Sequence, residues 1–379
     1  MSWPSVSLLD LCVVSTGKKD ANHAHNKGKY LFYTCADKPL RANTFAFEGN
    51  SIILPGNGAN VGLVLFYTGK FEAYQRTYVL NAFRDSVNAR YVYHHLKKFW
   101  KRLNENSQFG SATNYIRMQN FEDYKIPLPP LPEQKRIAAI LDKADDIRRK
   151  RRQAIDLADD FLRSVFLDMF GDSENRGWEI STVGEIADQK KGSMRTGPFG
   201  SQLLHSEFTD NGISVLGIDN VVSNTFKWAK PRFISQQKYE DELKRYTVKS
   251  GDVLISIMGT CGRCAIVPKD CPTAINTKHL CCITLDEDKI LPDFLHSYFL
   301  HHPEAEKYLS KNYKGAIMQG LNMGIIKAMP IPLVPKELQI KYKTIVCSIN
   351  KFKRKIESSS QLTENQFKAI SQQAFTGKL

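Results

Sequence analysis

The sequence predicts an α+β protein with two globular domains, two long helices and an internal repeat that relates its two halves. Length is the first observation behind this prediction, because 379 residues exceed one ordinary domain. The second is a set of residue patterns that occur in both halves in the same order. The third is a proline-rich segment in each half, followed by apolar residues at helical spacing.

The composition is that of a folded protein without a membrane or secretion signal. Hydrophobic residues make up 42% of the chain and aromatic residues 11%, and no low-complexity tract interrupts them. The first residues lack a basic leader region, and no apolar stretch approaches the roughly 20 residues of a membrane span. Eight cysteines at irregular spacing suit a reducing compartment. We therefore expect a soluble cytoplasmic protein with free thiols.

The net charge of +14 favours a polyanionic partner, because Lys and Arg residues that neutralise phosphates release counterions. Ribosomal and RNA-binding proteins share this property, so charge alone does not single out DNA. Residues 171–332 carry as many acidic as basic residues. If this second half binds nucleic acid, it has to do so through a local basic face.

The repeat is visible as matching residues and matching turn signals. Five positions near the start of the first half recur near the start of the second: Trp3, Leu8, Asp10, Leu11 and Gly17 as Trp178, Val183, Glu185, Ile186 and Gly192. Further along, residues 49–54 resemble residues 251–256. Glycine-rich turns follow at 58–62 and 259–262, which predicts a strand–turn–strand unit in each half.

A long helix is expected after the prolines of each half. We match three prolines of the first half with three of the second: Pro127, Pro129 and Pro132 with Pro330, Pro332 and Pro335. Residues 133–169 then keep an apolar stripe with alternating spacings of three and four, which is typical of a heptad seam. At 1.5 Å per residue this helix is about 55 Å long. Ordinary amphipathic helices packed on a domain core are the alternative.

Each stripe is expected to pack against the other helix. The positions expected in this seam are Ile137, Ile140, Ala144, Ile147, Ala154, Ala158, Phe161 and Val165 in the first helix, and Ile345, Ile349, Phe352 and Ile356 in the second. A basic run at residues 148–152 lies in the middle of the first helix. It fits either phosphate contacts or ion pairs with the nearby Asp145, Asp146 and Asp156.

Four segments together resemble the specificity subunits of type I restriction–modification systems. They are PLPPLPEQKRIAAILDKAD after the first domain, GPFGSQL at 197–203, GDVLISIMGTCGRCAIV at 251–267 and the terminal QQAFTGKL. The resemblance covers essentially the whole chain. The first half is shorter and lacks a close copy of GPFGSQL, so we expect the two halves to read different sequences.

The resemblance implies two target-recognition domains, at residues 1–128 and 173–331, which read the two halves of a bipartite, asymmetric DNA site. It also implies that residues 129–172 and 332–379 are spacer helices in an antiparallel coiled coil, with a pseudo-twofold relation between the halves. The implied partners are double-stranded DNA, two methylation subunits that bind S-adenosylmethionine and two restriction subunits that carry the motor and nuclease. The chain itself has no phosphate-binding loop, dinucleotide fingerprint or methyltransferase Asn/Asp-Pro-Pro-aromatic motif. We expect it to be non-catalytic and to bind no cofactor of its own.

Candidate DNA-binding residues are polar and basic side chains in expected loops, because Arg, Asn and Gln pair with base edges and Lys with phosphates. In the first half they are Lys18, Lys19, Asn57, Asn60, Gln75, Arg76, Thr77, Asn114, Arg117 and Gln119. In the second half they are Lys190, Lys191, Arg195, Ser201, Gln202, Thr260, Asn276, Lys278, Lys314, Gln319 and Asn322. The alternative for each single residue is a solvated surface group without a DNA contact.

Two other readings of the sequence remain open. A set of five cysteines and one histidine offers enough ligands for zinc: Cys261, Cys264, Cys271, His279, Cys281 and Cys282. The matching turn of the first half contains no cysteine, so we expect buried thiols and no metal site. A fused or diverged methyltransferase or nuclease, or a nucleic-acid-binding scaffold of similar build, are the alternatives to a specificity subunit.

Overall fold

The computed structural model describes the chain except residues 1–2, 106–114, 173–175, 314–319 and 377–379, with no side-chain description at some further positions within its helices. It contains two compact units. The first unit consists of residues 1–152 and 357–379, and the second unit of residues 153–356. The long helices α3 (Leu131–Phe170) and α8 (Lys336–Thr376) each contribute one part to each unit.

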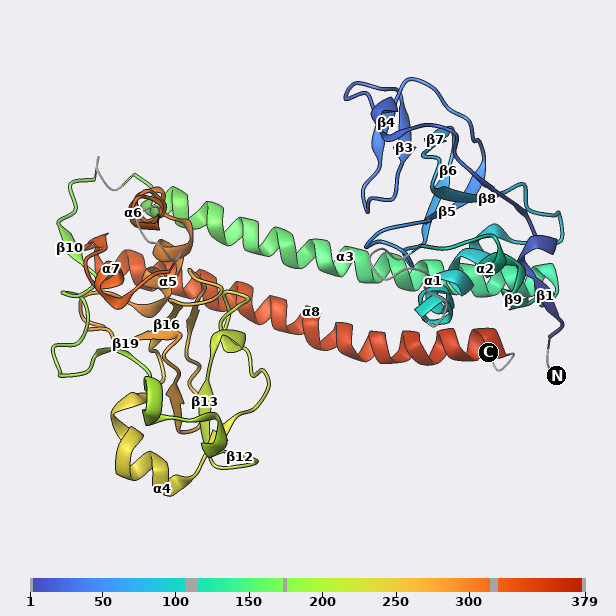
Figure 1. Cartoon of the computed structure of the whole chain (residues 1–379). Helices are drawn as coiled ribbons and strands as arrows, with labels where there is room; N and C mark the ends of the chain where they lie inside the picture. The colour runs from blue at the N-terminus through green and yellow to red at the C-terminus, as the bar shows by residue number, and fades with distance from the viewer. Residues whose placement is uncertain (1–2, 106–114, 173–175, 314–319, 377–379) are drawn as a thin grey trace. The chain divides into compact units, whose positions relative to one another are not determined.

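The first unit combines three small sheets with helices (Figure 1). Its elements other than the long helices are β1 (Ser5–Ser7), β2 (Val13–Thr16), β3 (Tyr30–Tyr33), β4 (Leu40–Ala42), β5 (Asn50–Pro55), β6 (Leu65–Thr68), β7 (Phe71–Ala73), β8 (Thr77–Asn81), β9 (Lys125–Pro127), α1 (Ala89–Glu105) and α2 (Gln119–Glu122). The sheets have the orders β2-β8-β5-β6, β4-β3-β7 and β1-β9. Apolar side chains of β5 and β8 pack with α1 and with Ile137 and Leu141 of α3 in one core.

The second unit repeats this plan with additional strands (Figure 1). Its strands are β10 (Ile180–Thr182), β11 (Met194–Thr196), β12 (Phe208–Thr209), β13 (Ile213–Leu216), β14 (Phe233–Ile234), β15 (Thr247–Val248), β16 (Val253–Ser256), β17 (Cys264–Ile266), β18 (Ala274–Asn276), β19 (Leu280–Ile283) and β20 (Pro330–Pro332). Its helices besides α3 and α8 are α4 (Gln236–Lys238), α5 (Pro292–His301), α6 (Pro303–Tyr313) and α7 (Met323–Lys327). The sheets have the orders β11-β19-β16-β17, β12-β14-β13-β18-β15 and β10-β20.

The internal repeat predicted from the sequence is confirmed strand by strand. Both four-stranded sheets are antiparallel, and both second sheets contain one parallel pair, β3 with β7 and β13 with β18. The equivalent helices α1 and α5 cover the equivalent strands β5 and β16. Leu8 and Val183 are both fully buried, and their backbone N–H groups donate to the equivalent carbonyls of Tyr124 and Met329.

The predicted register of the repeat is wrong at three places. Thr16 pairs with Tyr78 and Thr196 with Cys281, so Gly17 is equivalent to Gly197 and not to Gly192. A Cβ on Gly17 would lie 1.9 Å from the Ala73 carbonyl oxygen, and one on Gly197 would lie 1.9 Å from that of Asn276. Each position therefore requires glycine because another backbone approaches closely.

The other two register errors are shifts of one and two residues. Ile52 in β5 faces helix α1, so its equivalent in β16 should face α5. Val253 does so, whereas Leu254, the equivalent expected from the sequence, packs into a different core on the opposite face of β16. A slip of one residue reverses the face of every side chain in a strand. Among the prolines, Pro127 is equivalent to Pro332, because β1 pairs with β9 as β10 pairs with β20.

A buried glutamine follows each proline segment and ties the start of the long helix to its unit. The Gln134 side-chain amide donates to the carbonyls of Ser86 and Pro129, at 3.1 and 2.8 Å, and its oxygen accepts the Asn88 N–H at 2.8 Å.

The Gln339 amide makes the equivalent contacts in the second unit. It donates to Lys289 O at 3.0 Å and Val334 O at 2.8 Å, and its oxygen accepts the Leu291 N–H at 2.7 Å. Three chain segments thus meet at one side chain in each unit.

The two long helices run antiparallel within each unit. In the first unit, the Arg151 guanidinium donates to the Ser359 hydroxyl oxygen at 2.8 Å, and Phe375 packs into the core that contains Ile137. In the second unit, the Lys353 ammonium lies 2.5 Å from the Asp159 carboxylate, and Tyr342 packs on Phe166.

The expected seam is wrong at Phe161 and Phe352. Their side chains are 50% and 48% exposed, respectively. Leu162, next to Phe161, and Lys353, next to Phe352, are less exposed. An ideal α-helix drifts relative to a heptad repeat. Where two apolar residues are adjacent in the sequence, the heptad pattern therefore does not decide which of them faces the other helix. Ile137 and Ala158 are buried, and the remaining predicted positions are half-buried.

We predict that Gln339→Leu destabilises the second unit by about 2 kcal/mol or more, because it leaves two carbonyls and one N–H without their partner. The measurement is the melting temperature by differential scanning calorimetry. Gln153→Leu, at an exposed position of α3, is the matched control. Equal melting temperatures for the two variants would contradict the role given to Gln339.

A pH-dependent loss of stability is expected from His95. Burial, helped by the nearby Lys98 ammonium, lowers the pKa of His95 to about 3. Below the unfolded-state pKa of about 6.5, the unfolded chain binds a proton that folded His95 does not, so stability is full above that pH and falls below it. We expect His95→Gln to reduce the slope of melting temperature against pH between about 6.5 and 4.5. The exposed His25→Gln is the control, and identical slopes would refute the assignment.

Candidate nucleic-acid interface

Several of the candidate loops of the first unit meet at the end of its four-stranded sheet. The Gln75 N–H donates to Lys19 O at 2.9 Å, which joins the segment after β2 to the turn before β8. Gly56 N–H donates to Arg76 O, and Ile116 N–H donates to Gly56 O, both at 2.9 Å. A cavity of about 240 Å³ lies between them, lined by Asn57, Gln75 and Arg76 among others. Four segments that are far apart in the sequence thus form one surface.

The side chains of this first surface are basic or amide groups, and some are held in place. Lys18, Gln75, Arg76 and Arg117 are exposed. The Arg117 guanidinium lies over the Tyr115 ring, 5.1 Å from its centroid, and donates to the Tyr115 hydroxyl oxygen at 2.6 Å. A guanidinium stacked in this way is oriented before any ligand arrives, which reduces the entropic cost of binding.

Not every candidate of the first unit belongs to this surface. Thr77 is fully buried in β8, so its prediction as a DNA contact is wrong. The Asn60 amide donates to Cys35 O at 2.8 Å and holds a loop. Gln119 is exposed and donates to the Asp123 carboxylate at 3.1 Å. Asn114 lies outside the described residues.

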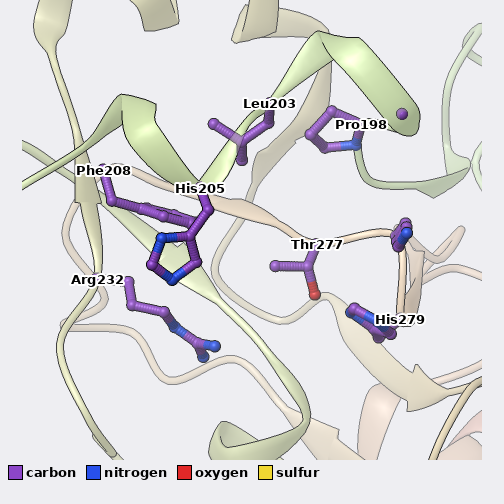
Figure 2. Close-up of a pocket in the computed structure, with 9 residues that line it drawn as sticks. Pro198, Leu203, His205, Phe208, Arg232, Thr277 and His279 are labelled. Atoms are coloured by element: carbon purple, nitrogen blue, oxygen red, sulfur yellow. The ribbon is translucent and has the colours of Figure 1, made fainter.

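The equivalent surface of the second unit is built from the segment after β11 and the turn after β18. Gly197 N–H donates to Thr277 O at 3.3 Å, and Ile257 N–H donates to His279 O at 2.8 Å. These bonds bring together the candidate segments around Ser201, Thr260 and Lys278. A cavity of about 440 Å³ lies here (Figure 2).

Two candidates of the second unit are part of its interior. Arg195 is 9% exposed, and its guanidinium donates to the Asp252 carboxylate at 2.6 Å and to the carbonyls of Gly192 and Thr247. Thr284 also donates to Asp252, at 2.6 Å. Asn276 is fully buried and donates to Leu280 O at 2.9 Å. Both predictions are wrong, because the sequence does not show that β11 and β18 point these side chains inward.

Four further candidates are placed away from the cavity or have structural partners. Lys190 and Lys191 precede β11, so they lie at the opposite end of that strand from Gly197, and Lys190 is 3.5 Å from Asp188. The Gln202 side chain accepts the Phe199 N–H and the Tyr246 hydroxyl, each at 3.0 Å. Asn322 caps α7 by accepting the Ile325 N–H at 2.9 Å. Lys314 and Gln319 lie outside the described residues.

Of the described residues that line the second cavity, only Lys278 is among the predicted DNA contacts. His205, Phe208 and Arg232 were missed. His205 and Phe208 follow the GPFGSQL segment directly, and that position is the one signal that could have indicated them. Arg232 precedes β14 in a loop without a recognisable pattern. Burial lowers the pKa of His279, and the positive charges of Lys278 and Arg232 lower it further. The surroundings of His279 are therefore electropositive.

Three cysteines of the second unit, Cys264, Cys281 and Cys282, are buried. Burial raises the pKa of the Cys264 thiol and raises that of Cys281 to about 12. Among the described residues, no group of three His, Cys, Asp or Glu side chains is placed so that it could hold a metal ion. Across the same residues, none of the helices has the length and apolar character needed to cross a membrane.

The fold and its two surfaces define a duplicated protein in which two similar α+β units each present polar and basic loops at the same edge of their main sheet. The chain belongs to the family described as type I restriction modification DNA specificity domain, whose model matches residues 2–157 and 175–365. The two matched regions correspond to the two copies of the repeat.

Two relatives named as type I restriction enzyme specificity subunits match this chain over different lengths. The type I restriction enzyme EcoDI specificity subunit of Escherichia coli is 40% identical over 142 residues, which cover 38% of this chain and 31% of that protein. The type I restriction enzyme MjaVIII specificity subunit of Methanocaldococcus jannaschii is 26% identical over 341 residues, which cover 87% of this chain and 79% of that protein.

Solved structures support the same fold. A type I restriction–modification S subunit from M. genitalium has a TM-score of 0.67 at 16% identity, covering 98% of this chain and 96% of that one. A chain from a study of type I R-M complex assembly has a TM-score of 0.51 at 16% identity, covering 100% and 98%.

Substitutions of the exposed Arg117 and the buried Arg195 should have different effects on DNA binding and on stability. We expect Arg117→Met to weaken DNA binding through the first unit by about 1–3 kcal/mol for a lost base contact, with little change in melting temperature. Arg195→Met should instead lower the melting temperature, because it leaves the buried Asp252 carboxylate without its positively charged partner. Fluorescence anisotropy and calorimetry on both variants provide the measurements. A destabilised Arg117→Met protein or an unaffected Arg195→Met protein would reverse these assignments.

Proposed function

We propose that this chain is the DNA-sequence-specificity subunit of a type I restriction–modification complex, in which each unit reads one half of a bipartite site. One observation carries the proposal: the same sheet edge presents basic side chains in both units, Arg76 and Arg117 in the first and Lys278 and Arg232 in the second. Such side chains bind base edges and phosphates. The names of the relatives, all of which describe type I specificity subunits, support the same role.

The two half-sites should differ, because equivalent positions carry different chemistry. Lys18 and Lys19 follow Gly17 in the first unit, whereas Pro198 and Phe199 follow the equivalent Gly197. The first unit adds Gln75, Arg76 and Arg117, and the second adds Lys278 and Arg232. An asymmetric target follows from these differences.

The long helices are proposed to set the distance between the half-sites. α3 has 40 residues and α8 has 41, and each unit contains a stretch in which the two helices contact one another in antiparallel orientation. At 1.5 Å per residue, α3 is about 60 Å long. A helix pair of fixed length can hold two readers at a fixed number of base pairs. In this proposal residues 129–172 and 332–379 are spacers, and residues 1–128 and 173–331 are target-recognition domains.

The chemistry is proposed to reside in partner subunits: two methylation subunits with S-adenosylmethionine and two restriction subunits. The chain has none of the phosphate-loop, dinucleotide or methyltransferase motifs, so we propose that it is non-catalytic. Exposed apolar side chains on the long helices offer a docking surface. Leu157 is 67% exposed and lies one turn from Phe161 on α3, and Phe352 is exposed on α8.

We call the exposed side chains of Leu157, Phe161 and Phe352 the helix patch and propose that they lie on one side of the helix pair. Leu157 and Phe161 each precede a less exposed residue, Ala158 and Leu162, and Phe352 likewise precedes Lys353. In an antiparallel helix pair, residues that come one position before a seam residue lie on the same side of the pair in both helices. Exposed apolar side chains gathered in this way are typical of protein interfaces.

The proposed function is tested by mapping methylated bases with single-molecule sequencing in cells that express the chain with its neighbouring methylation subunit. Methylation at one bipartite, asymmetric motif is expected. Arg117→Met should change the recognised bases of one half alone. Methylation without a defined motif, or a change in both halves, would reject the proposal. DNA cleavage or methylation by the purified chain alone would favour the enzymatic alternative.

We predict that Leu157→Glu combined with Phe161→Glu weakens assembly with the methylation subunit at least tenfold, because each charge must be desolvated at the interface. Co-purification and analytical ultracentrifugation measure assembly. Val222→Glu, at another exposed apolar position of the second unit, is the control. If the double variant assembles normally, the helix patch is not the surface that binds the methylation subunit.

A further inference from the structure

The cavity of the second unit has features beyond those of a flat DNA-reading surface. It measures about 440 Å³ and lies among the segment from Pro198 to Leu203, the residues His205 to Phe208, Arg232, and the turn at Thr277 to His279 (Figure 2). This volume is within the range of pockets that enclose small organic ligands. A phosphate group alone would leave most of it empty.

One side of the cavity is apolar. Pro198, Leu203 and Phe208 contribute carbon surfaces to its lining. The His205 ring packs against Phe208 edge to face, with centroids 5.7 Å apart, which fixes the orientation of both rings. Flat apolar surfaces of this kind accept a nucleobase, because every base has a π-face that stacks on aromatic side chains.

The other side carries two cationic groups. Arg232 and Lys278 line it beside the His279 ring, and Figure 2 shows the Arg232 and His279 side chains reaching toward the same space from different chain segments. The Asp219 carboxylate is hydrogen-bonded to the Arg232 guanidinium, which orients it and offsets part of its charge. The described lining residues include no carboxylate. An anion is therefore the favoured occupant of this side.

We infer that this cavity is a nucleotide-binding site, with the base against Phe208 and the phosphate at Lys278 and Arg232. The inference rests on the proposed function, because a nucleotide can be supplied by bound DNA as one unit displaced from the base stack. DNA as the source is supported by Phe199, which lies between the lining residues Pro198 and Gly200 and is 47% exposed. Exposed apolar side chains of this type insert between base steps and fill the space that a displaced base leaves.

The site is specific to the second unit. At the position of Pro198 and Phe199, the first unit has Lys18 and Lys19, which fit phosphate contacts and offer no apolar wall. The first unit's cavity is smaller, at about 240 Å³. We therefore expect the two units to hold DNA differently, one by surface contacts and the other by taking up a single nucleotide.

Ligand-observed NMR on the full chain tests the site directly. The probes are the four deoxynucleoside 5′-monophosphates, the corresponding deoxynucleosides and inorganic phosphate. At least one monophosphate should bind about tenfold or more tightly than either its nucleoside or phosphate, because base and phosphate contacts act together. Lys278→Met should weaken that binding about tenfold, as expected for a charge-assisted hydrogen bond. His279→Gln serves as a second variant should Lys278→Met fail to fold.

The control is Lys269→Met, which removes the same charge at an exposed position outside the cavity and should leave binding unchanged. Binding of phosphate as tight as that of every monophosphate would overturn the inference. So would equal effects of Lys278→Met and Lys269→Met.

Competition identifies the source of the nucleotide. If DNA places one of its own units in the cavity, the bound monophosphate should compete with a duplex that carries the mapped motif. If both bind together, the site takes a free nucleotide, and the nucleotide assignment still holds. A chain that binds the duplex but no monophosphate would refute this inference while leaving the proposed function intact. A chain that binds a monophosphate but no duplex would support the nucleotide site and contradict the proposed function.

Discussion

A single buried amide at the start of each long helix is the constraint on which the rest of the structure depends. Gln134 and Gln339 each join a proline segment, the start of a domain helix and the first turn of a long helix. An unpaired buried amide is costly, so all three segments must meet in one geometry for either unit to fold. The direction in which a long helix leaves its unit is thereby fixed by backbone carbonyls and not by flexible surface contacts.

Because the two units share this framework, differences between them are concentrated in loops. Gly17 and Gly197 permit the same close backbone approach at the same sheet edge, and the residues after them are free to differ. In the first unit this leads to an exposed basic surface around Arg76 and a stacked Arg117. In the second it leads to a cavity with an apolar wall and a cationic wall. Recognition of two different half-sites requires this combination of a constant scaffold with variable loops.

Much of the architecture could be predicted from the sequence, because prolines, heptad spacing and repeated turn signals report on local structure. The register between the halves could not. Gly192 has the positive φ of a turn, as Gly251 and Gly49 do, and a glycine in a turn cannot be distinguished from Gly197, which is needed for a close contact between distant strands. The burial of three polar side chains could not be predicted either. In the sequence Arg195, Asn276 and Thr77 look like surface residues, but in the paired strands their side chains point inward. Arg232 was missed because its position depends on the tertiary fold alone.

We propose that the long helices fix the distance between two independent readers, and a paired insertion into both helices tests this proposal. Four residues are added to α3 after Arg152 and four to α8 before Glu357, near the contact between Arg151 and Ser359, so that both helices lengthen together. Each gains about 6 Å, close to two base pairs at about 3.4 Å each. Once the variant is shown to fold and to assemble with its methylation subunit, sequencing of methylated bases gives its motif. We predict unchanged half-sites with a longer gap between them. Methylation of the original motif with its original spacing would contradict it.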